Sequence, residues 1–346
     1  MKQIKRLIGV SIIGILGLVL SFSACKKEAP VIRIGMNLWP GFEFLYLADK
    51  KGFFQDEGLD VQLFDFVSIS DSRRAFERGQ IDVVAATIVE LLIIKESSYK
   101  SPQAFYVTDF SNGADVILGK EPIKTVSELK GRRVGVEPAS LDLLTINLAL
   151  KHHKMTISDV VLVPMAQNGM EDSFENSNVD AICTYPPTSV KVLNKGNANI
   201  LFNSSQIPGY IVDALIADEQ FIDARVGDLA KILRCIDRAI QYFNEYPEEA
   251  LEIMAEHEQI SVPDIRDAFL GISVEPLKNQ INYFKPNGQL FIAAENALEV
   301  LRETGVITND INVSDLINQG PASEALSEQK LHGQTRFSFV EIIVEV

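Results

Sequence analysis

The sequence has few of the side chains that build disulfide frameworks, metal sites and catalytic clusters. Its 346 residues include three cysteines, four histidines and one tryptophan. Two of the cysteines, Cys183 and Cys235, are too far apart in the chain to form a disulfide framework or to match a metal-ligand spacing. The histidines do not cluster, and we therefore expect no metal, no cofactor and no catalytic residue. They are His152, His153, His257 and His332.

Basic residues are also scarce. Lysine and arginine total 32 against 47 for aspartate and glutamate, which gives a formal net charge of −15 at pH 7. A protein that binds nucleic acid presents a basic face to the phosphates, so this balance argues against a nucleic-acid partner. It does not restrict the ligand of an internal cleft, because net charge governs solubility rather than the chemistry of one site.

The apolar run at the N-terminus is too short to span a membrane. It covers 7–20, roughly fourteen residues, whereas a spanning helix needs about 20. Three positive charges precede the run in 1–6, and small residues follow it in 21–24. A basic start, a short apolar run and a small-residue end are typical of an export signal. The order therefore predicts that residues 1–24 are a signal peptide.

The end of this signal, Ser-Ala followed by Cys25, resembles the lipobox of bacterial lipoproteins, although Phe22 stands where leucine is usual. The resemblance implies that Cys25 is lipidated and anchors the protein to a membrane of the cell envelope, on its periplasmic or extracellular face. Plain secretion is the alternative. Loss of the signal removes three basic residues and moves the net charge from −15 to −18.

Strand and helix patterns alternate along the rest of the chain. A first group of strands is expected at 32–36, 61–66, 81–86 and 104–107, with helices at 45–51, 71–78 and 89–95. A second group follows with strands at 114–118, 133–136, 160–163 and 181–184, and helices at 126–129, 141–151 and 169–176. A last strand at 212–217 precedes long helices at 228–244 and 248–258. This alternation predicts an α/β fold with two doubly wound, mainly parallel sheets.

The chain is long enough for two lobes. About 320 residues remain after the signal, and 47% of the whole sequence is hydrophobic. The chain is expected to leave the first group near 112–116 and to return to it near 209–212. We therefore expect one lobe from 31–113 and 209–317, a second lobe from 114–208, and a cleft that closes by motion about the two connecting strands. The tail, 318–346, has no role that the sequence reveals.

Several segments, in this order and spacing, resemble the bacterial solute-binding proteins of ABC importers, in the branch for nitrate, sulfonates, taurine and thiamine precursors. They cover most of the chain from Ile32 to Ile317, and they are WPGFEFLYLADKKGFFQDEGLDVQL, SISDSRRAFERGQIDVVAAT, GADVILGKEPIKTVSELKGRRVGVEPAS, NVDAICTYPP and YPEEALEIMAE. The resemblance implies a two-lobed periplasmic-binding-protein fold of type II, a two-strand hinge and a monomer that captures a small molecule. It also implies an ABC permease as partner.

Candidate ligand-binding residues follow from the sheets alone, because ligands of doubly wound sheets lie beyond the carboxyl ends of the strands. In the loop after the first strand, Trp39 and Phe42 are expected to form a wall of the cleft, shaped by a Pro-Gly turn. Glu43 is placed to reach a donor on the ligand, and hydroxyls before helices to bind a polar oxygen or an anion. The predicted set is Asn37, Trp39, Pro40, Gly41, Phe42, Glu43, Ser70, Thr87, Ser140, Gln167, Tyr185 and Asp213.

Each assignment has a structural alternative. Trp39 and Phe42 could belong to the core of their own lobe, and Glu43 could stabilise the first turn of its helix. The serine and threonine hydroxyls could serve only as helix N-caps. Asp213, and Asp115 on the other crossing strand, could fix the hinge instead of contacting the ligand.

The predicted loops favour a planar or amine-bearing ligand. They contain no lysine or arginine except Arg73 and Arg74, which lie one turn into a helix, and they offer aromatic rings, Glu43 and hydroxyls. Such a set suits stacking and hydrogen bonds from ligand donors, so a thiamine-precursor pyrimidine or another heteroaromatic is preferred. A sulfonate, taurine or nitrate receptor remains the alternative, since helix N-termini alone can bind anions.

Two other classes share the fold. A sensor would present its ligand to a membrane signalling protein, and only the partner separates it from a transport receptor. The fungal thiamine-pyrimidine synthase and the chorismate-consuming menaquinone enzymes are the enzymatic alternatives. The synthase resemblance would require a cysteine-rich iron-binding segment and a histidine in the cleft. The predicted loops have no histidine and Cys183 stands alone, so we expect a protein that is not an enzyme.

Overall fold

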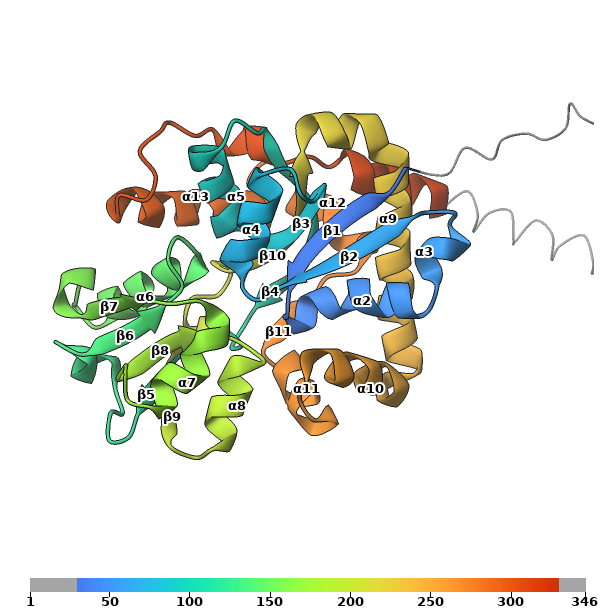
Figure 1. Cartoon of the computed structure of the whole chain (residues 1–346). Coiled ribbons are helices and arrows are strands. Elements are labelled where there is room, and N and C mark those ends of the chain that lie inside the picture. The colour runs from blue at the N-terminus through green and yellow to red at the C-terminus, as the bar shows by residue number, and fades with distance from the viewer. Residues whose placement is uncertain (1–29, 330–346) are drawn as a thin grey trace, which may run out of the picture. The chain divides into compact units, whose positions relative to one another are not determined.

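The computed structural model describes residues 30–329 of the chain, which form two β-sheets surrounded by helices (Figure 1). The expected signal peptide at 1–24, the expected lipidation at Cys25 and the end of the tail at 330–346 lie outside the described residues. Within 30–329, no helix is both long and apolar enough to cross a membrane.

The first sheet has six strands within the described residues, in the order β11-β4-β10-β3-β1-β2. β1 pairs in parallel with β2 and β3, whereas β10 runs antiparallel between β3 and β4. β3 and β4 are buried throughout and β10 in all but its last residue, as expected for strands covered on both faces, whereas β2 and β11 at the two edges are partly exposed. The strands are β1 (Ile32–Asn37), β2 (Val61–Phe66), β3 (Val83–Thr87), β4 (Pro102–Ser111), β10 (Val212–Asp218) and β11 (Ile272–Val274).

The second sheet has five strands in the part of the chain that is described, in the order β7-β6-β8-β5-β9. β6 pairs in parallel with β7 and β8, and β5 runs antiparallel to β8 and β9. The strands are β5 (Val116–Lys120), β6 (Arg133–Val136), β7 (Val161–Pro164), β8 (Ala181–Thr184) and β9 (Ala198–Asn203).

Helices follow most of the parallel strands, and three of these helices begin at a side-chain cap. The hydroxyl of Ser68 caps the helix after β2, that of Thr87 the helix after β3, and that of Ser140 the helix after β6. The helices of the first group are α2 (Glu43–Lys50), α3 (Phe53–Asp56), α4 (Ile69–Glu77) and α5 (Ile88–Ser97). Those of the second group are α6 (Leu141–His152), α7 (Met170–Glu175) and α8 (Thr188–Asn194). The later helices are α9 (Glu219–Glu245), α10 (Pro247–Glu258), α11 (Val262–Phe269), α12 (Gln280–Tyr283) and α13 (Gln289–Glu303).

The chain crosses between the sheets twice, after β4 and after β9. The two crossings are joined by hydrogen bonds: the hydroxyls of Ser111 and Ser204 are 2.7 Å apart, and the Gly113 amide donates to the Ser204 hydroxyl at 2.6 Å. Two short crossing segments that are hydrogen-bonded to each other favour motion about a defined hinge, whereas a flexible linker would leave the relative motion of the two parts undefined. The lobe boundaries at 31–113, 114–208 and 209–317 nevertheless remain a prediction.

Three details differ from the sequence-based expectations. The sheets are less parallel than predicted, because each contains a strand adjoining a crossing, β10 or β5, that runs against its neighbours. The edge strands β9 and β11 were not predicted. Part of the expected tail packs on the body of the protein: residues 320–329 are helical, Ala322 and Ala325 are fully buried, and Glu328 pairs with Arg234 of α9.

Candidate ligand-binding cleft

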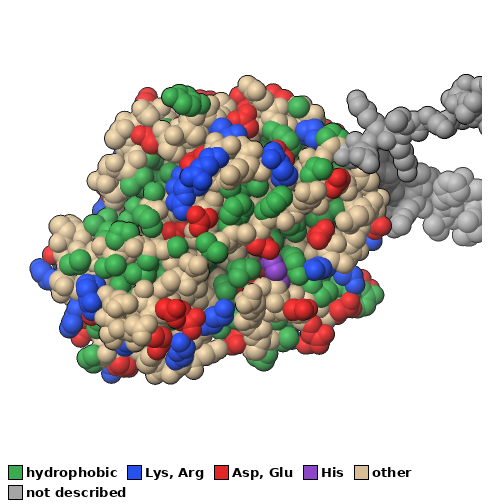
Figure 2. Space-filling model, viewed as in Figure 1, with side chains coloured by type: hydrophobic (Ala, Val, Ile, Leu, Met, Phe, Trp, Pro, Cys, Tyr) green, Lys and Arg blue, Asp and Glu red, His purple; other side chains and the backbone are tan. Residues whose placement is uncertain are grey.

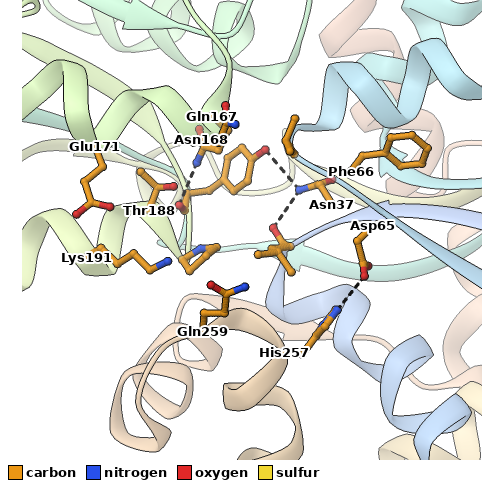
Figure 3. Close-up of a pocket in the computed structure, with 14 residues that line it drawn as sticks. Asn37, Asp65, Phe66, Gln167, Asn168, Glu171, Thr188, Lys191, His257 and Gln259 are labelled. Carbon is orange, nitrogen blue, oxygen red and sulfur yellow. Dashed lines mark hydrogen bonds and ion pairs between the residues drawn. The ribbon is translucent and has the colours of Figure 1, made fainter.

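An open cavity of about 380 Å³ lies where the strand ends of the two sheets face each other (Figure 3). One wall comes from the ends of β1 and β2 and from the end of α10. The opposite wall comes from the segments after β7 and β8. Figure 3 shows Gln167, Glu171 and Lys191 facing Asp65 and His257 across this space. We call this space the outer cavity. On the face of the protein in Figure 2, acidic and basic side chains are interspersed, with no large area of one sign.

A smaller space lies behind the outer cavity, and we call it the inner chamber. Its volume is about 10 Å³, roughly enough for one water molecule. Asn37 and Tyr185 line both spaces, and the amide of Asn37 donates to the Tyr185 hydroxyl at 3.4 Å. They therefore form a partition whose two halves belong to different sheets. The other residues that line the inner chamber include Trp39, Phe42, Thr87, Asp115 and Asp213.

Trp39 connects the two sheets through its ring. Its indole N–H donates to the Asp109 carboxylate, with oxygens at 3.2 and 3.3 Å. Its ring meets that of Tyr185 edge to face, with centroids 5.9 Å apart and planes at 84°. The side chain is 4% exposed. Trp39 is thus both a packed residue of the first sheet and a wall of the inner chamber, so the two readings of the sequence are not exclusive.

The crowding around Gly41 explains why this loop has a glycine after Pro40. A Cβ atom at Gly41 would lie 1.8 Å from Oδ2 of Asp109 and 2.8 Å from Nε1 of Trp39. No methyl group fits there, because the loop passes directly over the bond between the indole and the carboxylate. Pro40 sets the turn that starts with Trp39, and both residues are buried.

Gly41→Ala should therefore destabilise the protein by about 1–3 kcal/mol, because the added methyl must displace the Asp109 carboxylate or the loop itself. The matched control is Gly169→Ala, since a Cβ at Gly169 meets nothing within 4 Å. Urea unfolding of both variants measures the difference. Equal stabilities would show that the loop moves freely and that the bond between Trp39 and Asp109 is not fixed by Gly41.

Carboxyl groups are concentrated around the inner chamber. Asp109 and Asp213 face each other across β4 and β10. Burial raises the pKa of Asp109 to about 7 and that of Asp115 to about 7, and it raises the pKa of Asp213 well above its usual value. Within 30–329, the buried carboxyl residues of this region are Glu90, Asp109, Asp115, Glu137, Asp142 and Asp213, each at most 3% exposed.

Two of these carboxylates bind helix N-termini across the cleft. Glu137, which follows β6 of the second sheet, accepts a hydrogen bond from the Ser70 amide in the first turn of α4, at 2.7 Å. Glu90 of α5 accepts one from the Leu141 amide at the start of α6, at 3.0 Å. Burial raises the pKa of Glu90 to about 7. The acid that caps each of these helix N-termini thus comes from the part of the chain built on the other sheet.

The structure brings some of the predicted residues together and places others elsewhere. Asn37, Trp39, Phe42, Thr87, Tyr185 and Asp213 surround the inner chamber, and Gln167 lines the outer cavity. The Ser70 hydroxyl donates to the carbonyl of Pro138 at 3.2 Å, and the Ser140 hydroxyl caps α6. Glu43 is fully buried and accepts from Nδ1 of His257 at 2.8 Å.

Sequence reasoning missed part of the outer cavity. The predicted loops contain neither lysine nor histidine, but Lys191 of α8 and His257 of α10 also line the outer cavity, together with Asp65 and Gln259. Lys191 and His257 lie on helices, and a search of the predicted strand ends could not have found them. Asp65 stands near the carboxyl end of β2, so the same rule could have found it.

His257 is held in a charged network. Burial lowers the pKa of His257, but its hydrogen bonds to Asp65 and Glu43 outweigh this effect and raise the pKa to about 10. The ring also stacks on Tyr46, with centroids 3.7 Å apart and planes at 8°. A protonated histidine fixed on three sides adds a positive charge beside the outer cavity without being free to act as a base.

The fold is that of the periplasmic solute-binding proteins. The alkanesulfonate-binding protein SsuA from Xanthomonas axonopodis pv. citri, solved with bound MOPS, superposes with a TM-score of 0.73 at 15% identity, covering 84% of this chain and 99% of that one. The nitrate-binding protein NrtA from Synechocystis PCC 6803 superposes with a TM-score of 0.69 at 14% identity, covering 87% and 89%. These similarities confirm the predicted fold class.

Residues 39–250 match the family described as NMT1/THI5 like, and the chain belongs to it. This confirms the family predicted from the sequence motifs. A relative named "Putative binding protein YtlA" from Bacillus subtilis (strain 168) is 19% identical over 336 residues, 93% of this chain and 98% of that protein. The 4-amino-5-hydroxymethyl-2-methylpyrimidine phosphate synthase of Candida albicans (strain WO-1) is 23% identical over 223 residues, 60% and 64% of the two chains.

Proposed function

We propose that this protein is a solute receptor that captures a small molecule between its two lobes and delivers it to an ABC permease. The observation that carries the proposal is the convergence of both sheets on connected spaces. Asn37 ends β1 of the first sheet and Trp39 follows it, Tyr185 follows β8 of the second sheet, and all three residues line the inner chamber. Binding sites at strand ends between two such units are typical of α/β folds.

Contacts across the cleft support closure as the mechanism. The amide of Ser70 binds Glu137, that of Leu141 binds Glu90, and Asn37 binds Tyr185. Contacts of this kind favour the closed form, and a ligand that touches both sides adds to them. Opening about the two crossings separates Asn37 from Tyr185, which removes the partition and joins the inner chamber to the outer cavity.

The cellular setting of the proposal comes from the sequence. An export signal at 1–24 and lipidation at Cys25 would hold a monomeric receptor at the outer face of a membrane, within reach of its permease. A sensor that presents its ligand to a signalling protein would need the same location. The resemblance of the chain's motifs to receptors of ABC importers favours transport.

We propose a heteroaromatic or amine-bearing ligand, such as a pyrimidine of the thiamine-precursor type. Trp39, Phe42 and Tyr185 line the inner chamber and offer ring faces and edges, which suit a planar solute. The chain's similarity to the fungal pyrimidine phosphate synthase agrees with this choice.

A sulfonate or similar anion is the second candidate. Lys191 lines the outer cavity, and the protonated ring of His257 lies near it. Structural similarity to a sulfonate-binding protein points the same way. The charge of His257 is already matched by Glu43 and Asp65, so Lys191 is the main attraction for an anion here.

Binding rather than catalysis is also part of the proposal. Burial raises the pKa of the Cys183 thiol well above its usual value, so this cysteine is not a reactive thiolate. His257 is fixed between two carboxylates and a tyrosine ring, as described above. Neither side chain has the environment of a nucleophile or of a general base.

Native mass spectrometry of the full chain, purified without denaturation, tests the receptor function. A co-purified small molecule is expected, and its mass decides between the two ligand classes. A thermal-shift screen with pyrimidines, amines and sulfonates follows if the protein is empty. A chain that carries no solute, and whose unfolding temperature no solute raises, would count against a receptor.

A further inference from the structure

We infer that the inner chamber, once opening of the lobes has joined it to the outer cavity, binds a cationic nitrogen group of the ligand, such as an ammonium or an amidinium, and that it rejects anions. The inference rests on the proposed function, since it names the charge of the solute that the cleft receives. It is carried by the polar atoms that face the chamber and by the carboxylates that already occupy its helix N-termini.

The chamber presents acceptors that lack donors. Oδ2 of Asp115 and Oδ2 of Asp213 have no hydrogen-bond partner among residues 30–329, although both side chains are only 3% exposed and line the chamber. Oδ1 of Asn37, an uncharged acceptor on a side chain 4% exposed, is also unpaired within this range. A buried polar group without a partner costs about 1–3 kcal/mol, so these three atoms favour a ligand rich in N–H donors.

The places where an anion would bind are already taken. Helix N-termini attract anions through their free amides, and α4 and α6 both begin beside the chamber. The first turn of α4 binds Glu137, and the first amide of α6 binds Glu90. Oε2 of Glu137 is itself without a partner in the described part of the chain. An entering sulfonate or nitrate would therefore meet carboxylates rather than free amides.

The carboxyl groups and the aromatic walls favour a cation. Although burial raises the pKa of Asp115 to about 7 and that of Asp213 well above its usual value, a bound cation would lower both pKa values and hold the two groups ionised. The guanidinium of Arg73 lies near the six buried carboxyl groups, but it already forms an ion pair with Glu77. Trp39 and Tyr185 add ring faces to the wall, which attract organic cations more readily than hydrated metal ions. A ligand with a cationic head in the chamber could place a polar or anionic substituent near Lys191 in the outer cavity.

Three planar probes of nearly equal shape test the inference on the full chain. Benzamidine is a cation, benzamide is neutral and benzoate is an anion. Thermal unfolding with each probe should show that benzamidine binds about tenfold tighter than benzamide, which corresponds to about 1.4 kcal/mol, and that benzoate binds most weakly. The inference is wrong if benzamidine stabilises the protein no more than benzamide or benzoate does. Equal protection by calcium chloride would overturn the assignment to an organic cation.

Variants locate the cation site. Asp115→Asn and Asp213→Asn should each abolish most of the preference for benzamidine over benzamide, because each keeps the size of the side chain and removes a carboxyl group that a bound cation would hold ionised. Asp172→Asn, at an exposed position of α7, is the matched control and should keep the wild-type preference. A preference that survives both chamber substitutions would place the cation elsewhere. A sulfonate found by native mass spectrometry would overturn this inference and leave the receptor function standing.

Discussion

Raising the pH from about 5.5 to about 8 should lower the free energy of unfolding by about 2 kcal/mol through the carboxyl group of Asp115 alone. Burial raises the pKa of this group from 3.8 to about 7 in the folded protein, although the Ser111 side chain partly offsets the shift. The folded state therefore binds the proton more tightly than the unfolded state does. The stabilisation is complete below about pH 4 and is lost as the pH rises through 7.

Two neighbouring carboxyl groups, those of Glu90 and Asp109, also lower the free energy of unfolding as the pH rises. The pKa of Glu90 and that of Asp109 are each raised to about 7 by burial, so both add to the loss of stability. The Arg73 charge lowers the pKa of Glu90, and the hydrogen bonds from Thr108 and Trp39 lower that of Asp109, but burial outweighs them. Their contributions do not add independently, since the carboxyl groups interact with one another.

Urea unfolding at both pH values, on the wild type and on Asp115→Asn, isolates the contribution of this group. The variant should lose about 2 kcal/mol less than the wild type over the same range. The comparison removes the effect of His257, whose raised pKa also makes stability fall above about pH 6.5 in both proteins. Identical pH dependence in the two proteins would mean that Asp115 is ionised at pH 5.5 and that the chamber is more hydrated than its burial suggests.

The sequence predicts the architecture because the strands are short, apolar and separated by well-marked helix ends. β3 and β8 are buried on both faces, and each is a nearly continuous run of apolar residues. Such runs can be recognised as strands from the sequence without knowing which residues they contact. The direction of β10 and β5 could not be predicted from their residues, because an antiparallel strand that is buried on both faces has the same composition as a parallel one. β11 has three residues, too few for a period to show.

The candidate site is only partly predictable for a related reason. The strand-end rule identifies Trp39, Thr87 and Tyr185, since these residues directly follow strands or end them. It does not identify Asp109 as the partner of the Trp39 indole, because that pairing depends on which strand lies beside which. His257 enters the outer cavity from the end of α10, and only the packing of that helix on the first sheet places it there.

Trp39→Ala is expected to have the largest effect of any single change in the cleft. The residue is only 4% exposed, so removing its side chain leaves a large cavity and should cost about 3–5 kcal/mol of stability. The substitution also removes the indole donor that holds Asp109, and the pKa of this carboxyl should rise further without it. Ligand binding should weaken by about 1–3 kcal/mol through the lost aromatic wall.

Trp39→Phe separates the two roles of the residue. Phenylalanine keeps an aromatic face toward Tyr185 but cannot donate to Asp109, so this variant should lose about 1–3 kcal/mol of stability and most of its ligand affinity should remain. Urea unfolding measures the first effect, and calorimetry with the co-purified solute measures the second. Because Trp39 is the only tryptophan, the wild type also reports binding through its fluorescence. If Trp39→Phe binds the solute as weakly as Trp39→Ala, the fixed position of Asp109 rather than the ring governs affinity, and the loop after β1 matters chiefly because it orients that carboxylate.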